Sequence, residues 1–566
     1  MMGRMLSVRS IRAGAGPRML VLAVSIALVA AACNTSSPSP SVPGPTAAPG
    51  SQEPGSAPEP GTTLTAALSD LSAMDWTPAL SSGDEEKILA QIGDNLTDLN
   101  RETSAIEPGL AESWEISEDG TTWTWKLRPD VPFHDGWGTV TSEDVKFTYW
   151  EWARPDTSTH SIGPQLLQAI DGNLDNFEIV DELTFRLHTT NPVVQLPALL
   201  CSCNPGPTIT SKKYFDETPV EEANDHPIGT GPFKFVSGTP GLEIELEAVP
   251  GHPWRQTPSF ERLTLLEVAD GAARLAQVQS GEVDIALLDS QLVGEATAAG
   301  LTISTIKDFG NAFVLLGGSY WGDEALDRDS PWIQADAPEK GLAIRQAMSL
   351  AIDRQLIIDR VLNGQATLAY GPLIQYPTPD FTDPSWTYPE YNLELAREKL
   401  AEGGYPEGFP VTVALFSDDI DTAAVDEAIA GMWEQLGLDV TRMPTEKDAI
   451  DPLQENRTTD GLAYVLISGF VPEPAKTLSN YDSRRPDDAK LFLPELDAAY
   501  DAISVETDYD RRMQLTRDII EVLRDQYQPI TLFTVDMPFV TGPDVASWSP
   551  IPGTNFMNSL ETITPR

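Results

Sequence analysis

Strand-like and helix-like patterns alternate along the chain from about residue 62 onward, and this alternation narrows the folds open to it. Residues 122–127 (TWTWKL) alternate polar and apolar side chains, as a strand with one buried face does. Residues 341–362 instead repeat apolar side chains at helical spacing, as one long helix or two would, and stop at Asn363-Gly364. Further strands are expected at 63–68, 183–187, 283–288, 301–306, 411–416, 438–441 and 529–535, and further helices at 142–150 (with Ser142 as N-cap), 272–279, 393–402, 424–436 and 508–527. The sequence therefore predicts the α/β class.

The N-terminus has the pattern of a secretory signal peptide. Four arginines precede an apolar run at 19–32: Arg4, Arg9, Arg12 and Arg18. That run is too short to cross a hydrocarbon core of about 30 Å as a helix. A basic start, a short apolar run and small residues before a cleavage point are typical of a signal peptide. We therefore expect residues 1–32 to be removed.

Cys33 follows the apolar run directly, after Ala30-Ala31-Ala32. This junction resembles a lipobox, in which the cysteine carries the lipid, although Ala30 stands where leucine is usual. The alternative is an ordinary signal peptide followed by a chance cysteine. An exposed free thiol at a mature N-terminus would be reactive, which favours lipidation of Cys33.

Residues 33–61 are predicted to be a flexible linker behind the lipid. From residue 34 they are mostly Ser, Pro, Gly, Thr and Ala, a composition that cannot bury enough apolar surface to fold. A lipid on such a linker would hold the body near a membrane without embedding it. Beyond the linker no run of 18 apolar residues occurs, so we expect the body itself to be soluble.

The charge balance excludes one large class of partners. The chain has 37 Lys and Arg against 85 Asp and Glu, a formal net charge of −48. Nucleic-acid binding needs a basic footprint, so we expect no nucleic-acid partner. About 500 residues follow the linker, enough for two or three domains.

Cys201 and Cys203 are the two cysteines after Cys33. A single Cys-Ser-Cys offers too few ligands for a zinc site. A small local disulfide in an oxidising compartment is the preferred interpretation.

Enzyme signatures are missing from the sequence. No two of the five histidines have the helical spacing of a zinc site: His134, His160, His188, His226 and His252. The sequence also contains no phosphate-binding loop, dinucleotide fingerprint or nucleophile elbow. Residues 304–307 match Ser-x-x-Lys of penicillin-recognising enzymes but lack the Lys-Thr-Gly partner and lie in a strand pattern. Residues 171–182 match half of a calcium loop, but Asn176 replaces the glycine of its turn. We expect no enzyme activity, no metal and no cofactor.

Seven sequence elements in order carry a family resemblance. They are 110–114 with 117–120, 123–128 with 131–136, 140–145, 227–233 (PIGTGPF), 273–276 with 280–285 (SGEVDI), 344–347 with 351–354, and 396–409. Together they resemble the signature segments of the family 5 extracellular solute-binding proteins, the oligopeptide-, dipeptide- and nickel-binding group. The similarity covers about residues 62–560.

This resemblance implies a two-lobed periplasmic-binding-protein fold, type II and cluster C-like, with three domains and a ligand cleft between lobes that close around a hinge. By position, domain I would be 62–106, 216–315 and 536–566, domain II 107–215, and domain III 316–535. It implies a monomeric lipoprotein that hands a peptide, oligosaccharide or similar solute to the permease of an ABC importer. A sensor or chaperone-like module on the same scaffold is the alternative, and a secreted enzyme is a weaker one.

The ligand is constrained by a departure from the family. In the peptide binders an Asp before a Glu-Pro or Asp-Pro pair holds the peptide's α-ammonium group. When Glu473-Pro474 is aligned on that pair, Phe470 occupies the Asp position. A buried ammonium without a carboxylate is costly, so an ordinary peptide is doubtful unless Glu473 substitutes. Aromatic rings near the expected cleft suit sugars or other apolar-faced solutes, although each ring could instead be part of the core. The candidate ligand contacts are Trp76, Ser81, Trp321, Tyr370, Gly469, Phe470 and Glu473.

Overall fold

The computed structural model describes residues 63–71, 74–79, 83–103, 105–154, 163–203, 208–318, 327–372, 382–416, 420–446, 449–469, 473–479, 481, 493–554 and 556–566. They all belong to one compact unit, residues 58–566. The predicted signal peptide, Cys33 and the linker lie outside the described residues. None of the helices within these ranges is long and apolar enough to cross a membrane.

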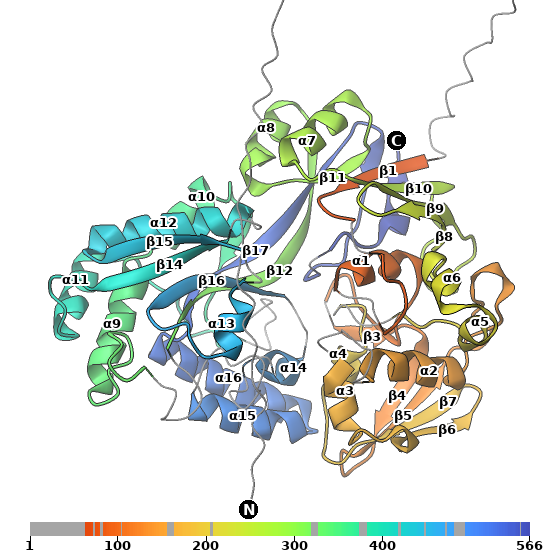
Figure 1. The fold of residues 1–566 in the computed structure, drawn as a ribbon, viewed down its shortest axis with the longest axis horizontal. Coiled ribbons are helices and arrows are strands. Elements are labelled where there is room, and N and C mark those ends of the chain that lie inside the picture. Colours follow the sequence, from red (N-terminus) through yellow and green to blue (C-terminus); the bar gives the residue numbers. More distant parts are fainter. Residues whose placement is uncertain are drawn as a thin grey trace, which may run out of the picture. The chain divides into compact units, whose positions relative to one another are not determined.

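An 11-stranded mixed sheet runs through the unit (Figure 1). Its order is β15 (Asp439–Thr445), β14 (Pro410–Phe416), β16 (Leu462–Gly469), β12 (Thr302–Leu316), β17 (Ile530–Thr541), β11 (Ile285–Leu287), β1 (Thr63–Leu68), β10 (Arg262–Glu267), β9 (Glu243–Ala248) and β8 (Phe233–Thr239), with β13 (Ala366–Leu368) also on β17. Strand β14 is parallel to β15 and β16, and β1 is parallel to β10 and β11, whereas the other pairs are antiparallel.

Strands β12 and β17 join the two sides of this sheet. The first part of β12 pairs with the last part of β17, next to β11, and the second part pairs with β16. We name the side with β13–β16 and helices α9–α16 the C-terminal lobe, and the side with β1–β11 and α1–α8 the N-terminal lobe. Because both strands take part in both sides, a bend in them reorients one lobe against the other.

The pairing of β12 with β17 is interrupted at residues 307–309. Asp308 has a φ of 53°, and its backbone N–H donates to Asp536 at 3.0 Å. Thr534 donates its hydroxyl to the Asp308 carboxylate at 2.8 Å, and Lys307 forms an ion pair with the buried Asp536. The polar side chains therefore hold the irregular backbone at the crossing of the two strands.

A separate antiparallel sheet carries the aromatic core of the N-terminal lobe. Its order is β4 (Ala111–Ile116), β5 (Thr122–Leu127), β7 (Thr184–His188) and β6 (Phe177–Asp181). Trp125 on β5 is fully buried and stacks on Trp114 and Phe185, with ring centroids 5.4 and 6.1 Å away. The strand predicted at 122–127 is confirmed. Two short pairs, β2 (Thr97–Leu99) with β3 (Ile106–Pro108) and β18 (Val545–Ser547) with β19 (Thr564–Pro565), complete the strands of the described ranges.

The helices that were predicted are present, with shifted ends, and several others, such as α1 and α15, were not predicted. The helices of the N-terminal lobe are α1 (Gly83–Ile92), α2 (Ser142–Ala153), α3 (Gly163–Ala169), α4 (Leu196–Leu199), α5 (Lys212–Glu217), α6 (Val220–Asp225), α7 (Gly271–Ser280) and α8 (Val293–Ala298). Those of the C-terminal lobe are α9 (Pro338–Leu350), α10 (Arg354–Arg360), α11 (Leu393–Glu402), α12 (Ile420–Leu436), α13 (Asp451–Glu455), α14 (Pro474–Ser479), α15 (Pro494–Val505) and α16 (Tyr509–Gln526). Helix α2 is capped one residue earlier than expected, because Thr141 and Asp144 form a capping box. The long pattern at 341–362 resolves into two helices, α9 and α10, and the Asp353 side chain caps the second.

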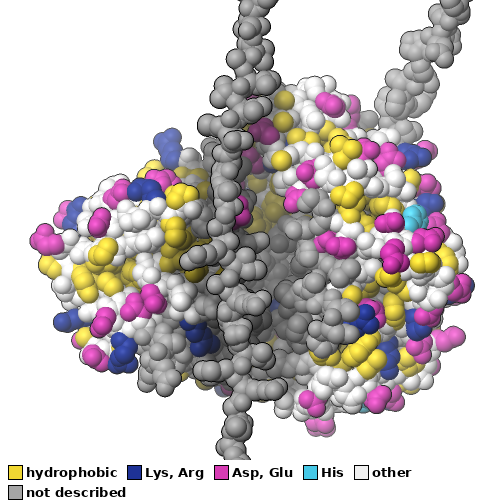
Figure 2. Space-filling view, viewed as in Figure 1, with side chains coloured by type: hydrophobic (Ala, Val, Ile, Leu, Met, Phe, Trp, Pro, Cys, Tyr) yellow, Lys and Arg dark blue, Asp and Glu magenta, His cyan; other side chains and the backbone are white. Residues whose placement is uncertain are grey.

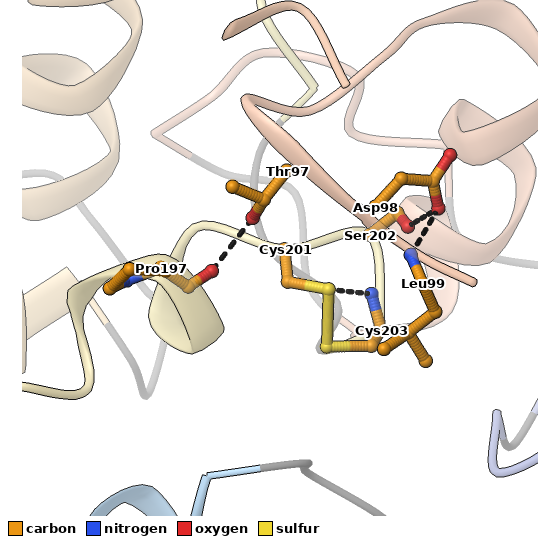
Figure 3. Close-up of a disulfide and its surroundings, with 7 residues drawn as sticks. All are labelled: Thr97, Asp98, Leu99, Pro197, Cys201, Ser202 and Cys203. Carbon is orange, nitrogen blue, oxygen red and sulfur yellow. Dashed lines mark hydrogen bonds between the residues drawn. A yellow bond between two sulfur atoms is a disulfide. The ribbon is translucent and has the colours of Figure 1, made fainter. Parts of the chain in front are cut away.

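The expected local disulfide joins Cys201 and Cys203 (Figure 3). The Cys203 N–H donates to the Cys201 sulfur at 3.1 Å, and the intervening Ser202 donates its hydroxyl to Asp98 on β2. Thr97, also on β2, donates to the Pro197 carbonyl at 2.7 Å. The disulfide turn is thus held against β2 in the N-terminal lobe.

The acidic surplus lies on the surface. Figure 2 shows Asp and Glu side chains spread over the visible face of both lobes, in keeping with the net charge of −48. Exposed charge of one sign keeps a protein soluble and carries no information about its fold.

Candidate ligand-binding site

Gly469, a predicted ligand contact, ends β16 next to the junction of the lobes. It is exposed and pairs with Gly310 on β12, directly after the interrupted pairing at 307–309. A Cβ on Gly469 would meet no atom within 4 Å, so open space adjoins this strand end. Three further candidates, Ser81, Trp321 and Phe470, lie outside the described residues, as does Cys33.

Glu473 is buried at the start of α14 and is paired. Its carboxylate accepts from Arg512 of α16 at 3.3 Å and from the backbone N–H of Ala475 at 3.4 Å. Burial raises the pKa of Glu473, and the positive charge of Arg512 opposes this shift. Arg512 also donates to the Glu506 and Thr507 carbonyls. This carboxylate therefore already neutralises a cation of the protein itself.

Trp76 lies in the core of the N-terminal lobe. Its side chain is 5% exposed, its ring packs against Phe235 at 6.3 Å between centroids, and its backbone N–H donates to Asn224 at 2.8 Å. A ring so placed stabilises the lobe by burial of apolar surface.

Tyr370 lies in the C-terminal lobe and stacks on Tyr388, with ring centroids 4.2 Å apart. Both rings line a cavity of about 350 Å³ that is formed by this lobe alone. Neither Trp76 nor Gly469 lines this cavity. Of the described candidates, Gly469 and Glu473 are the two that lie near each other in the chain and at the end of β16.

The lobes also touch away from β12 and β17. The backbone N–H of Val194, after β7, donates to the Ser504 carbonyl at the end of α15, at 3.3 Å. The Val194 side chain is 6% exposed and packs in the same buried cluster as Leu496 and Ile503. Gly120 comes close to the same helix end, since a Cβ there would lie 3.3 Å from Thr507. This second contact bridges the lobes on the side of β5 and β7.

A buried charge network in the N-terminal lobe was not anticipated from the sequence. Arg255 lies between two buried carboxylates, 3.2 Å from Asp94 and 3.2 Å from Glu561. His252 and Thr230 also bond to Asp94, at 2.9 and 2.7 Å. Burial alone would raise the pKa of Asp94, but the bond to His252 and the charge of Arg255 outweigh it and lower the pKa to about 2.

The cavity beside this charge network is too small to hold a solute. It has a volume of about 40 Å³ and is lined in part by Asp94, Arg255 and Glu561. Such a space can hold a water molecule but no solute. The network therefore holds together three chain segments and is no ligand site. Within the described ranges no group of three or more His, Cys, Asp or Glu is placed to hold a metal ion.

Comparisons with known proteins agree with the fold. The sequence model of the bacterial extracellular solute-binding proteins, family 5 Middle, matches residues 105–488. The heme-binding protein A of Haemophilus influenzae is 27% identical over 376 residues, which are 62% of this chain and 63% of the relative, so the chain spans less than two thirds of that protein's length. The di/tripeptide-binding protein 1 of Pseudomonas aeruginosa is 24% identical and covers 78% of this chain and 83% of its own.

A solved structure extends the likeness to the whole body. The crystal structure of NikA from Brucella suis, in complex with Fe(III)-EDTA, superposes with a TM-score of 0.71 at 20% identity and covers 89% of this chain and 100% of its own. At that identity the likeness shows the fold: a two-lobed type II periplasmic-binding-protein fold. The chain belongs to the family 5 bacterial extracellular solute-binding proteins.

Proposed function

We propose that this protein captures a small organic solute outside the cytoplasmic membrane and delivers it to the permease of an ABC importer. The match of the family's sequence model over residues 105–488 carries this proposal. The arrangement of β12 and β17 supports it, because two strands shared by both lobes form a hinge around which a cleft can close. We assign the domains as 62–106, 216–315 and 536–566 for domain I, 107–215 for domain II and 316–535 for domain III.

The protein is anchored, in this proposal, by a lipid on Cys33 after removal of residues 1–32. The apolar run and the Ala-Ala-Cys junction support this arrangement. The linker at 34–61 then allows the body to reach a permease in the same membrane.

The solute is not held through a free α-ammonium group. Such a group needs an unpaired carboxylate in the closed cleft. Phe470 replaces the aspartate of the peptide binders in the sequence, and the carboxylate of the Glu-Pro pair, Glu473, is paired with Arg512. An aromatic side chain at position 470 suits a sugar face, an aryl group or an acyl chain.

Calorimetry with a solute panel tests this ligand class. Mass spectrometry of the protein as purified first identifies any retained molecule. We then expect di- to pentapeptides to bind no better with a free N-terminus than after N-acetylation. Phe470→Ala should weaken binding of the retained solute about 100-fold, because loss of a fully packed ring costs about 3 kcal/mol.

Phe147→Ala is the matched control for that experiment. Phe147 is a partly buried ring on α2 that contacts Phe215, far along the chain from β16. Its loss should leave affinity unchanged. Micromolar binding of free peptides that N-acetylation abolishes would overturn the proposed ligand class, as would an unchanged affinity of Phe470→Ala.

Lobe closure can be tested at Val194. Val194→Asp places a carboxylate among Leu496, Ile503 and their neighbours, where burial of an unpaired charge costs about 2 kcal/mol or more. We expect the equilibrium between open and closed forms to move toward the open form by a factor of about 30. Small-angle scattering should show a larger radius of gyration than for the wild type. Val180→Asp, on the exposed part of β6, is the control and should not change it. Equal radii for all three proteins would contradict closure through this contact.

A further inference from the structure

The cavity beside Tyr370 and Tyr388 has the size of a ligand site and is built by the C-terminal lobe alone. Its volume is about 350 Å³, within the range of small-molecule pockets, and it is lined by α9, α11, the end of α16 and the loop 387–390. The function proposed above does not use it. The stacked tyrosines form part of the wall, and Leu350 and Leu395 add apolar surface.

Arg524 of α16 is a cationic side chain in this wall. Its guanidinium lies 5.0 Å from the centre of the Trp386 ring, and one nitrogen, Nη2, donates to the Thr387 carbonyl at 3.1 Å. The other terminal nitrogen, Nη1, is shielded from solvent and has no hydrogen-bond partner. Arg524 forms no ion pair with any described residue. A shielded donor without a partner is costly, and an anion in the cavity would remove that cost.

A second cation lies beneath the cavity. Ser349 and Thr531 line it, and Arg354 bonds to both, at 2.8 Å to the Ser349 hydroxyl and 2.7 Å to the Thr531 carbonyl. Arg354 is 2% exposed, and all its bonds go to carbonyl and hydroxyl groups. Burial lowers its pKa to about 9, so the guanidinium remains charged at neutral pH. Its charge is therefore not offset by a carboxylate of the described chain.

Other charged side chains lie near these two guanidinium groups. Lys399 lines the cavity and pairs with Glu402 at 2.7 Å. Glu390 also lines the cavity, and Asp525 and Glu521 act on Arg524 without forming an ion pair with it. In a chain with a net charge of −48, a concave site with two unpaired guanidinium groups is a local exception.

We propose that this cavity is a second binding site, which takes a small carboxylate with a planar apolar body, such as an aryl carboxylate. The carboxylate would accept from Arg524, and the apolar part would lie against the tyrosine pair. The proposal does not depend on what the solute cleft binds.

Phenylacetate titrated into the protein tests the proposal, with binding followed by calorimetry and ligand-observed NMR. We expect saturable binding that Arg524→Gln weakens by a factor of about 10 to 100, the effect of removing a charged hydrogen bond. Tyr388→Leu, at an exposed loop position, should weaken it several-fold. The neutral analogue phenylacetamide should bind at least about tenfold more weakly than phenylacetate to the wild type.

Arg511→Gln is the matched control, because Arg511 is an exposed arginine on the same helix that does not line the cavity. It should bind phenylacetate as the wild type does, and so should Phe470→Ala. If phenylacetate does not bind, or if Arg524→Gln and Tyr388→Leu both bind it with unchanged affinity, the site is not as proposed. Binding lost in Phe470→Ala but kept in Arg524→Gln would place the probe in the solute cleft and overturn the proposal equally.

Discussion

Arg255→Ala is expected to lower the free energy of unfolding by about 3–5 kcal/mol, the usual cost of removing one partner from a buried ion pair. Arg255 is the cation between Asp94 and Glu561, whose side chains are 4% and 0% exposed. Without it, the two buried carboxylates lose the cation that they share, although Asp94 keeps its bonds to His252 and Thr230. Arg101 still reaches Glu561 at 3.2 Å from the surface, but it makes no contact with Asp94.

Urea unfolding followed by tryptophan fluorescence measures this effect, because many of the lobe's buried or partly buried rings are tryptophans, among them Trp76, Trp114, Trp123, Trp125, Trp152 and Trp254. The transition of Arg255→Ala should shift to lower urea with little change in slope. Arg262→Ala is the matched control. Its side chain is 53% exposed and lies 3.8 Å from Glu245, so its loss should cost about 0.5 kcal/mol or less. Equal midpoints for the two variants would show that the network does not stabilise the lobe.

The ion pairs of Arg255 could not be predicted from the sequence. Asp94 follows α1, Arg255 follows β9, and Glu561 lies near the end of the chain. No periodic pattern links residues that are 161 and 306 positions apart, so only the fold brings them together. The stack of Tyr370 on Tyr388 likewise joins two segments of the chain that no periodic pattern links. By contrast the Cys201–Cys203 disulfide follows from spacing alone.

Several strands were not predicted, among them β9 and β16, and two of the predicted strands proved longer than expected because they are buried. The strand expected at 301–306 is the first part of β12, which continues to Leu316. From Gly310 onward every residue of β12 is buried, so apolar and polar side chains no longer alternate. Strand β17 likewise extends six residues beyond the predicted end at Val535, with both faces covered along most of its length. The pattern that marks a strand is lost where the strand crosses the middle of the molecule.

Ligand-binding residues are harder to predict than helices and strands, because the same type of side chain can either bind a ligand or stabilise the fold. Trp76 has the apolar surface that a stacking residue needs, and the fold uses that surface in a core. Glu473 has the charge to hold an ammonium group, and the fold pairs it with Arg512. The sequence contains the residue types but not their partners, and the partners decide whether a side chain remains available to a ligand.

Cys33→Ser is expected to have the largest effect on where the protein is found. If Cys33 carries the lipid, the wild type should fractionate almost entirely with membranes, because each buried CH₂ contributes about 0.8 kcal/mol and two chains give stable anchoring. No described helix is long and apolar enough to cross a membrane, and the net charge of −48 repels anionic lipid surfaces. The variant should therefore move to the soluble fraction and lose incorporation of a fatty-acid label.

The double change Cys201→Ser and Cys203→Ser, which keeps Cys33, should remain with the membranes. Cys33→Ser protein that still needs detergent for its release would show that another segment holds it, and that the junction at residues 30–33 is an ordinary cleavage site.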